Sequence, residues 1–141
     1  MVVLVDANVI LDYIASREPY YRDAYKVMEL CHSGETEGYL SFHSVSIIWY
    51  TLRKFVPDAG ERRAWMRKIL QMIRVTGASH EAVLKAVDME DFRDFEDCLQ
   101  DRCAETVNAR YIITNNVKDF KSSIVPAITP GDFLELWDKQ I

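Results

Sequence analysis

Short apolar runs alternate with longer stretches in which apolar residues recur at helical spacing along the whole chain. The first run, Val2 to Val5, is continuous and mostly β-branched, which predicts a strand covered on both faces of a sheet. A strand is also expected in each of four later runs, namely Tyr39 to Phe42, Val75 to Thr76, Tyr111 to Thr114 and Ala127 to Thr129. Each run is too short to be a helix of ordinary length.

Helices are predicted between these strands from the spacing of apolar residues and from the Pro, Gly and Ser residues that bound them. They follow Asp6 and cover Tyr20 to Cys31, Ser44 to Phe55, Glu61 to Arg74, Glu81 to Val87, Asp94 to Asn108 and Gly131 to Lys139. Alternating strands and helices are typical of a parallel sheet with helices on both faces. The sequence therefore predicts the α/β class, as a three-layer α/β/α sandwich with a central five-stranded parallel sheet, in a single domain over residues 1–141.

Composition and cysteine use narrow the setting of the protein. With 49% hydrophobic residues in 141, the chain can bury a core. It contains no apolar run near the roughly 20 residues that a membrane span needs, and it has no signal-peptide pattern, so we expect a cytoplasmic protein without membrane contact. Three cysteines without a CxxC pair fit a reducing compartment and the role of small core residues.

The net charge of -5 is distributed unevenly. The segment 80–105 contains nine acidic and three basic residues, which makes it either a solvated acidic helix face or a place that holds a divalent cation. The third and fourth predicted helices are basic by contrast, and their charges either neutralise phosphates or simply face solvent. Those basic residues are Arg53, Lys54, Arg62, Arg63, Arg67 and Lys68.

Acidic residues stand at three places where strands and helices meet. Asp6 directly follows the first strand, where open α/β sheets bind ligands, although it would also suit the N-cap of the next helix. Asp94, Asp97 and Asp101 share one face of the predicted helix 94–108, with capping and helix-dipole effects as the alternative explanation. Asp119 follows the fourth strand. Together these places predict an oxygen-ligand cluster suited to Mg²⁺ or Mn²⁺.

The order and spacing of five short segments resemble the PIN domain, in the bacterial branch similar to VapC-type toxin ribonucleases. These segments read DANVILD, LRK, DFEDCLQ, ITNNVKDF and ITPGDFL. The resemblance implies metal-dependent hydrolysis of RNA with Mg²⁺ or Mn²⁺, and as partners RNA, a small antitoxin protein and a second copy of the chain in a homodimer. It implies that the metal ligands and catalytic acids are Asp6, Asp97 and Asp119, that Glu96 is a further catalytic group, and that Thr114, Asn115 and Asn116 bind substrate.

Two alternatives stay open at this point. The predicted helix from Ser44 to Phe55 has no acidic residue, whereas many PIN proteins have a glutamate there, so a PIN module that binds nucleic acid or a protein partner without cleavage is the main alternative. A phosphohydrolase with Asp6 as nucleophile, as in the haloacid dehalogenases, needs a second acid two residues later. This chain has Asn8 at that position.

Overall fold

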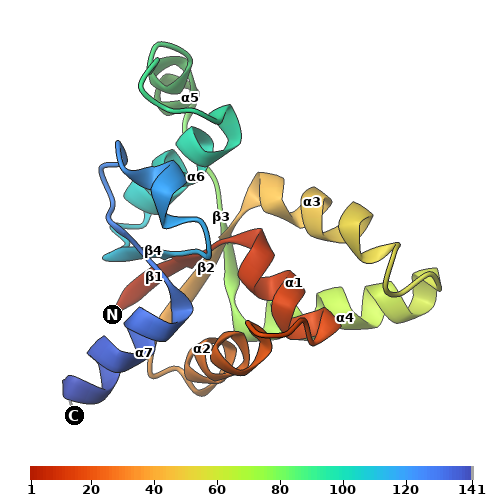
Figure 1. The fold of residues 1–141 in the computed structure, drawn as a ribbon. Coiled ribbons are helices and arrows are strands. Elements are labelled where there is room, and N and C mark those ends of the chain that lie inside the picture. The colour runs from red at the N-terminus through yellow and green to blue at the C-terminus, as the bar shows by residue number, and fades with distance from the viewer. Residues whose placement is uncertain (141) are drawn as a thin grey trace.

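The computed structural model describes residues 1–140, and its ribbon is drawn in Figure 1. Five strands form one sheet in the order β3-β2-β1-β4-β5, and every neighbouring pair is parallel. The strands are β1 (Val2–Val5), β2 (Glu37–Ser41), β3 (Arg74–Thr76), β4 (Tyr111–Ile113) and β5 (Ala127–Ile128). The predicted five-stranded parallel sheet is confirmed.

Helices cover both faces of this sheet (Figure 1). One face is packed by α6, with α5 beside it, and the other is covered by α1, α2, α3, α4 and α7. Their bounds are α1 (Ala7–Ala15), α2 (Tyr21–Ser33), α3 (Phe42–Leu52), α4 (Ala59–Met72), α5 (His80–Val87), α6 (Phe95–Thr106) and α7 (Pro130–Lys139), with a short 3-10 helix η1 (Val117–Phe120). The predicted three-layer α/β/α arrangement is therefore confirmed.

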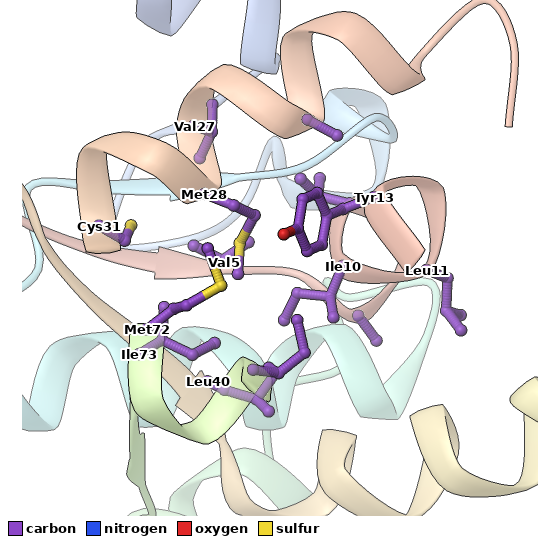
Figure 2. Close-up of a cluster of buried hydrophobic side chains, with 14 of the residues drawn as sticks. Val5, Ile10, Leu11, Tyr13, Val27, Met28, Cys31, Leu40, Met72 and Ile73 are labelled. Carbon is purple, nitrogen blue, oxygen red and sulfur yellow. The ribbon is translucent and has the colours of Figure 1, made fainter. Parts of the chain in front are cut away.

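The central strand β1 is apolar throughout because both of its faces are covered. Val3 and Val5 point into the larger core, where side chains from α1 and α2 meet β1, as Figure 2 shows. Leu4 points to the opposite face and packs with Cys103 and Ile112 in a second core. All three β1 residues are fully buried, so the strand that precedes Asp6 is held from both sides.

The entry into α3 differs from the prediction. Strand β2 ends at Ser41, and Phe42 is the first residue of α3 rather than the end of the strand. Ser44, predicted as the cap, lies inside the helix, and its buried hydroxyl is 2.6 Å from that of Ser41 at the N-cap position. Two serines three residues apart both match a capping pattern, and the pairing of β2 with its neighbours decides which one ends the strand. The helix ends at Leu52, before Phe55.

The three cysteines have the role that the sequence predicts. Cys31, Cys98 and Cys103 are free and buried, which confirms them as core residues. Burial raises the pKa of the Cys31 thiol to about 12 and that of Cys103 to about 11, so both stay protonated at neutral pH. Among residues 1–140, no helix combines the length and the apolar character that crossing a membrane requires.

Gly38 in β2 provides a direct test of the packing between β2 and α2. A Cβ atom at Gly38 would lie 2.6 Å from Sγ of Cys31 and 2.9 Å from Cγ2 of Ile73. We expect Gly38→Ala to lower the free energy of unfolding by about 1–3 kcal/mol, because overpacking forces a closely packed core apart. Urea denaturation measures this change. Gly77→Ala is the control, since its Cβ meets no atom within 4 Å; equal stability of the two variants would contradict the packing described here.

Candidate active site

The strand order of the sheet changes direction between β1 and β4. From β1 the chain continues outward through β2 to β3, and β4 and β5 are added on the other side. At such a switch point the loops diverge and leave a crevice beyond the carboxyl ends of the strands, which is where α/β sheets bind ligands. Asp6 follows β1 and Thr114 follows β4, and the Thr114 hydroxyl donates a hydrogen bond of 2.7 Å to Oδ2 of Asp6.

The Asp6 carboxylate is held by donors from three segments. Besides Thr114, Gln100 on α6 donates to Oδ1 at 2.6 Å and Asn8 donates to Oδ2 at 3.1 Å. Asp6 occupies the N-cap position of α1, but its side chain makes no capping hydrogen bond, so capping does not account for this acid. Burial raises the pKa of the Asp6 carboxyl, and the hydrogen bonds from Thr114 and Gln100 oppose that shift.

The acidic residues predicted from three separate segments lie near one another. Asp97 is in the first turn of α6, and burial together with neighbouring carboxylates raises its pKa to about 7. The neighbours that repel its ionised form are Asp94, Asp6, Asp119 and Glu96. The fold thus concentrates negative charge at the switch point, as the sequence predicts.

The acids of α6 have different roles in the structure. Asp94 is the N-cap, and its side chain accepts a hydrogen bond of 2.8 Å from the backbone N–H of Glu96. Asp101 is 0% exposed, pairs with Arg102 at 2.6 Å and accepts from the backbone N–H groups of residues 124 and 125 at 2.9 Å each. Asp101 lies four residues after Asp97 on the same helix, as predicted, but it adds no free charge to the site because buried donors satisfy its carboxylate.

The loop between β4 and η1 contains the predicted substrate-binding residues. Thr114 is buried on Asp6, and the amide of Asn115 donates to Oδ2 of Asp12 at 2.6 Å. Asn116 is exposed, and its backbone N–H donates to the Thr114 hydroxyl at 3.0 Å. Asp119 follows on η1 and is partly exposed. The structure thus leaves Asn116 and Asp119 at the crevice, while the Asn115 amide donor is already used inside the protein.

Two residues that hold this site together, Gln100 and Asp12, were not predicted. Gln100 lies three residues after Asp97, so helical spacing places it on the same side of α6, but nothing in the sequence indicates its partner Asp6. Its Oε1 accepts a hydrogen bond of 3.2 Å from Ser41, which contacts Ser44 in turn. Helix α3 therefore reaches Asp6 through hydroxyl groups and an amide rather than through an acid. Asp12 is the second of these residues. The feature of the sequence that could have indicated it is an acidic residue within an apolar helical run.

His43 on α3 stands beside this acidic group without balancing its charge. Burial lowers the pKa of its imidazole, although the nearby Glu96 and Asp6 carboxylates act in the opposite direction. The imidazole is therefore largely neutral at pH 7. The repulsion among the carboxylates is not relieved by this histidine.

The basic residues of α4 are mostly engaged in packing. Arg62 is buried, donates to the carbonyls of residues 56 and 57 at 3.0 Å each, and stacks on Trp49 at 4.6 Å. Lys68 lies over the Tyr13 and Trp65 rings at 5.6 and 5.0 Å. The hypothesis that all these cations serve phosphate binding is wrong for Arg62, since its charge is stabilised by carbonyl oxygens and an aromatic face.

The donor set fits a hard divalent cation in its chemistry. Mg²⁺ and Mn²⁺ prefer carboxylate and amide oxygens, which are the groups gathered here. Burial raises the pKa of Asp97 most, and the neighbouring carboxylates add a repulsion that a cation would relieve. Within residues 1–140, however, no three His, Cys, Asp or Glu side chains are yet arranged closely enough to hold an ion.

Comparison with known proteins identifies the family. A sequence profile described as PIN domain matches residues 2–118. The chain therefore belongs to the PIN domain family. No curated protein matches the sequence.

Solved structures share the fold at low sequence identity. A chain of VapBC2 from Rickettsia felis, bound to a promoter DNA fragment, is 16% identical with a TM-score of 0.70, covering 92% of this chain and 98% of that one. A chain of a toxin-antitoxin complex from Klebsiella pneumoniae is 19% identical with a TM-score of 0.67, covering 91% of this chain and 97% of that one. VapC20 of Mycobacterium tuberculosis, a sarcin-ricin loop cleaving toxin, is 14% identical with a TM-score of 0.60, covering 78% of this chain and 86% of that one.

The raised pKa of Asp97 predicts a specific dependence of stability on pH. In the unfolded chain Asp97 ionises near 3.8, whereas in the folded protein it keeps its proton up to about pH 7. Its contribution to stability is therefore present below pH 3.8 and is lost as the pH rises to about 7. Because Asp97→Asn removes this titration, we expect its stability relative to the wild type to increase between pH 5 and pH 8.

Urea denaturation in EDTA at the two pH values measures that difference. Asp138→Asn, which removes an exposed acid from α7, controls for the change in net charge. A difference between Asp97→Asn and wild type that is the same at both pH values would show that the fold does not raise the pKa of Asp97.

Proposed function

We propose that this PIN domain protein is a Mg²⁺- or Mn²⁺-dependent ribonuclease that hydrolyses phosphodiester bonds of RNA. The observation that supports it most is that carboxylates from β1, α6 and η1 lie near one another at the switch point of the sheet, so that Asp6 and Asp119 add to the effect of burial in raising the pKa of Asp97. Like charges held together cost folding stability. Their convergence is understandable if a divalent cation joins them during function.

Each acid has a distinct part in this proposal. Asp6, Asp97 and Asp119 would hold the cation, and the exposed Glu96 would position water or complete the ligand set. Hydrogen bonds from Thr114, Gln100 and Asn8 fix the orientation of the Asp6 carboxylate.

The substrate is positioned by the exposed end of the loop in this proposal. Asn116, whose side chain faces solvent beside Asp119, would contact a phosphate of the RNA. A bound divalent cation would stabilise charge on the scissile phosphate and lower the pKa of the attacking water. Asn115 would support the loop through its hydrogen bond to Asp12, because its amide nitrogen is already used in that bond and does not contact the RNA.

Loss of the central ligands tests the ribonuclease proposal. We expect Asp6→Asn and Asp97→Asn each to lower the rate of single-stranded RNA cleavage in Mn²⁺ at least about 100-fold, because removing a ligand costs at least as much as removing its supporting contacts. Calorimetry on the same samples measures Mn²⁺ affinity, and Asp138→Asn is the matched control. Cleavage that survives in both variants contradicts the assigned ligands.

A PIN module that binds RNA without cleaving it is the second candidate. The observation in its favour is that Ser41 at the end of β2 and Ser44 in α3 supply hydroxyls at this place instead of an acid. Such a protein holds RNA equally well in EDTA and in Mn²⁺ and leaves it intact. Binding of Mn²⁺ that disappears in Asp97→Asn, together with cleavage, decides for the ribonuclease.

We also propose that the protein is the toxin of a toxin-antitoxin pair and that it forms a homodimer. The solved structures with the same fold include toxin-antitoxin complexes, which supports an antitoxin protein as partner. For the homodimer, the support is an apolar groove of about 860 Å³ between α3 and α4. Phe42 and Tyr50 on α3 are 73% and 63% exposed there, an apolar surface suited to a second copy.

Light scattering tests the homodimer. We expect a mass of twice 16.4 kDa for the wild-type protein, and a shift toward the single-chain mass for Tyr50→Lys, since a buried unpaired charge opposes association. Lys139→Ala on α7 serves as a control outside the groove. A wild-type protein that stays at the single-chain mass contradicts the homodimer.

A further inference from the structure

Asp12 is a buried acid whose position in α1 is unfavourable for an acid. Its carboxylate is 3% exposed and lies near the carboxyl end of the helix. Burial and the negative end of the helix dipole both oppose an ionised side chain there. Its two oxygens are nevertheless both engaged, one by Arg17 and the other by Asn115.

Arg17 explains only one of these contacts. Its Nε donates to Oδ1 of Asp12 at 2.7 Å, and its Nη2 donates to the carbonyl of Asn8 at 3.4 Å. The guanidinium also lies 5.9 Å from the centre of the Phe55 ring, beyond the end of α3. Arg17 thus balances the charge of Asp12 and ties down the end of α1. None of its recorded contacts is with the β4–η1 loop.

The second oxygen of Asp12 connects α1 to the active-site loop. Oδ2 accepts the Asn115 amide at 2.6 Å, across 103 positions of sequence. Asn115 stands directly after Thr114, which donates to Asp6, and four residues before Asp119. The loop is therefore fastened at adjacent residues, to the catalytic carboxylate by one and to α1 by the other.

We propose that Asp12 is a positioning residue, which through Asn115 holds the β4–η1 loop so that Thr114 stays on Asp6 and Asp119 stays near Asp97. The inference rests on the proposed function only for its consequence on metal affinity. The fastening of the loop is a separate property of the protein without metal, and it can be measured separately.

Three single variants separate the two contacts of Asp12. Asp12→Ala removes both, and Asn115→Ala removes only the bond to the loop. Arg17→Gln removes the ion pair and leaves the bond to Asn115, although it also removes the contacts of Arg17 with the Asn8 carbonyl and the Phe55 ring. The double variant Asp12→Ala with Asn115→Ala completes a cycle. Amide hydrogen exchange of residues 114–119 in EDTA reports the fastening of the loop, and calorimetry with Mn²⁺ reports its effect on the site.

We expect faster exchange in the loop for Asp12→Ala and Asn115→Ala, and wild-type protection for Arg17→Gln. We expect about 10–100-fold weaker Mn²⁺ binding in the first two variants, the range for loss of a contact that supports a ligand. The double variant should bind no more weakly than Asp12→Ala, since both changes remove one interaction.

Other outcomes overturn the inference in distinguishable ways. Unchanged loop exchange in Asn115→Ala shows that the bond does not position the loop, whether or not the wild type binds Mn²⁺. Loop exchange in Arg17→Gln that matches Asp12→Ala shows that Asp12 acts through the end of α1. If Asp12→Ala does not fold, Asn115→Ala still decides, because it leaves the ion pair of Asp12 with Arg17 intact. A wild type without Mn²⁺ binding defeats the proposed function alone.

Discussion

The hydrogen bond between Thr114 and Asp6 is the interaction on which the rest of the site depends. It joins the ends of β1 and β4, which are 108 positions apart in sequence, at the point where the strand order changes direction. Because β1 is packed on both faces, Asp6 cannot shift with its strand. Gln100 then adds a donor from α6, so the carboxylate acquires its environment only when the sheet and that helix have come together. The site is consequently a product of tertiary structure, with each donor satisfying part of a buried charge.

The distribution of acids along α6 determines where the uncompensated charge lies. Asp94 caps the helix, and Asp101 is neutralised by Arg102 and two backbone N–H groups. That leaves Glu96 and Asp97 in the first turn, where the positive end of the helix dipole favours them but does not cancel the field of Asp6 and Asp119. The uncompensated charge in the first turn of α6 therefore lies at the crevice, while the other free acids of the segment, Glu81, Asp88, Glu90, Asp91 and Glu105, are exposed to solvent.

The strands, the layers and the places of the acids follow from sequence because they depend on local rules. Val2–Val5 reads as a buried strand without any knowledge of its neighbours, and Asp6 is placed by the general behaviour of strand ends. The contacts of Gln100 and Asp12 cannot be predicted from the sequence, because each joins residues about a hundred positions apart. The spacing of apolar residues indicates which side of a helix is buried, but not which residue packs against it. The packing role of Arg62 cannot be predicted for the same reason, because its carbonyl and aromatic partners come together only when α3 and α4 pack.

The missing acid of α3 is better understood through what replaces it. Ser44, Ser41 and Gln100 form a chain of neutral groups that ends on Oδ1 of Asp6. These groups orient Asp6 without adding charge to a site in which burial and repulsion together already raise the pKa of Asp97 to about 7. A further carboxylate on α3 would increase that repulsion, so its absence lowers the cost of folding the site. In the ribonuclease that we propose, it would also leave Asp6, Asp97 and Asp119 with a larger share of the cation's coordination, which would make the support of the Asp119 loop correspondingly more important.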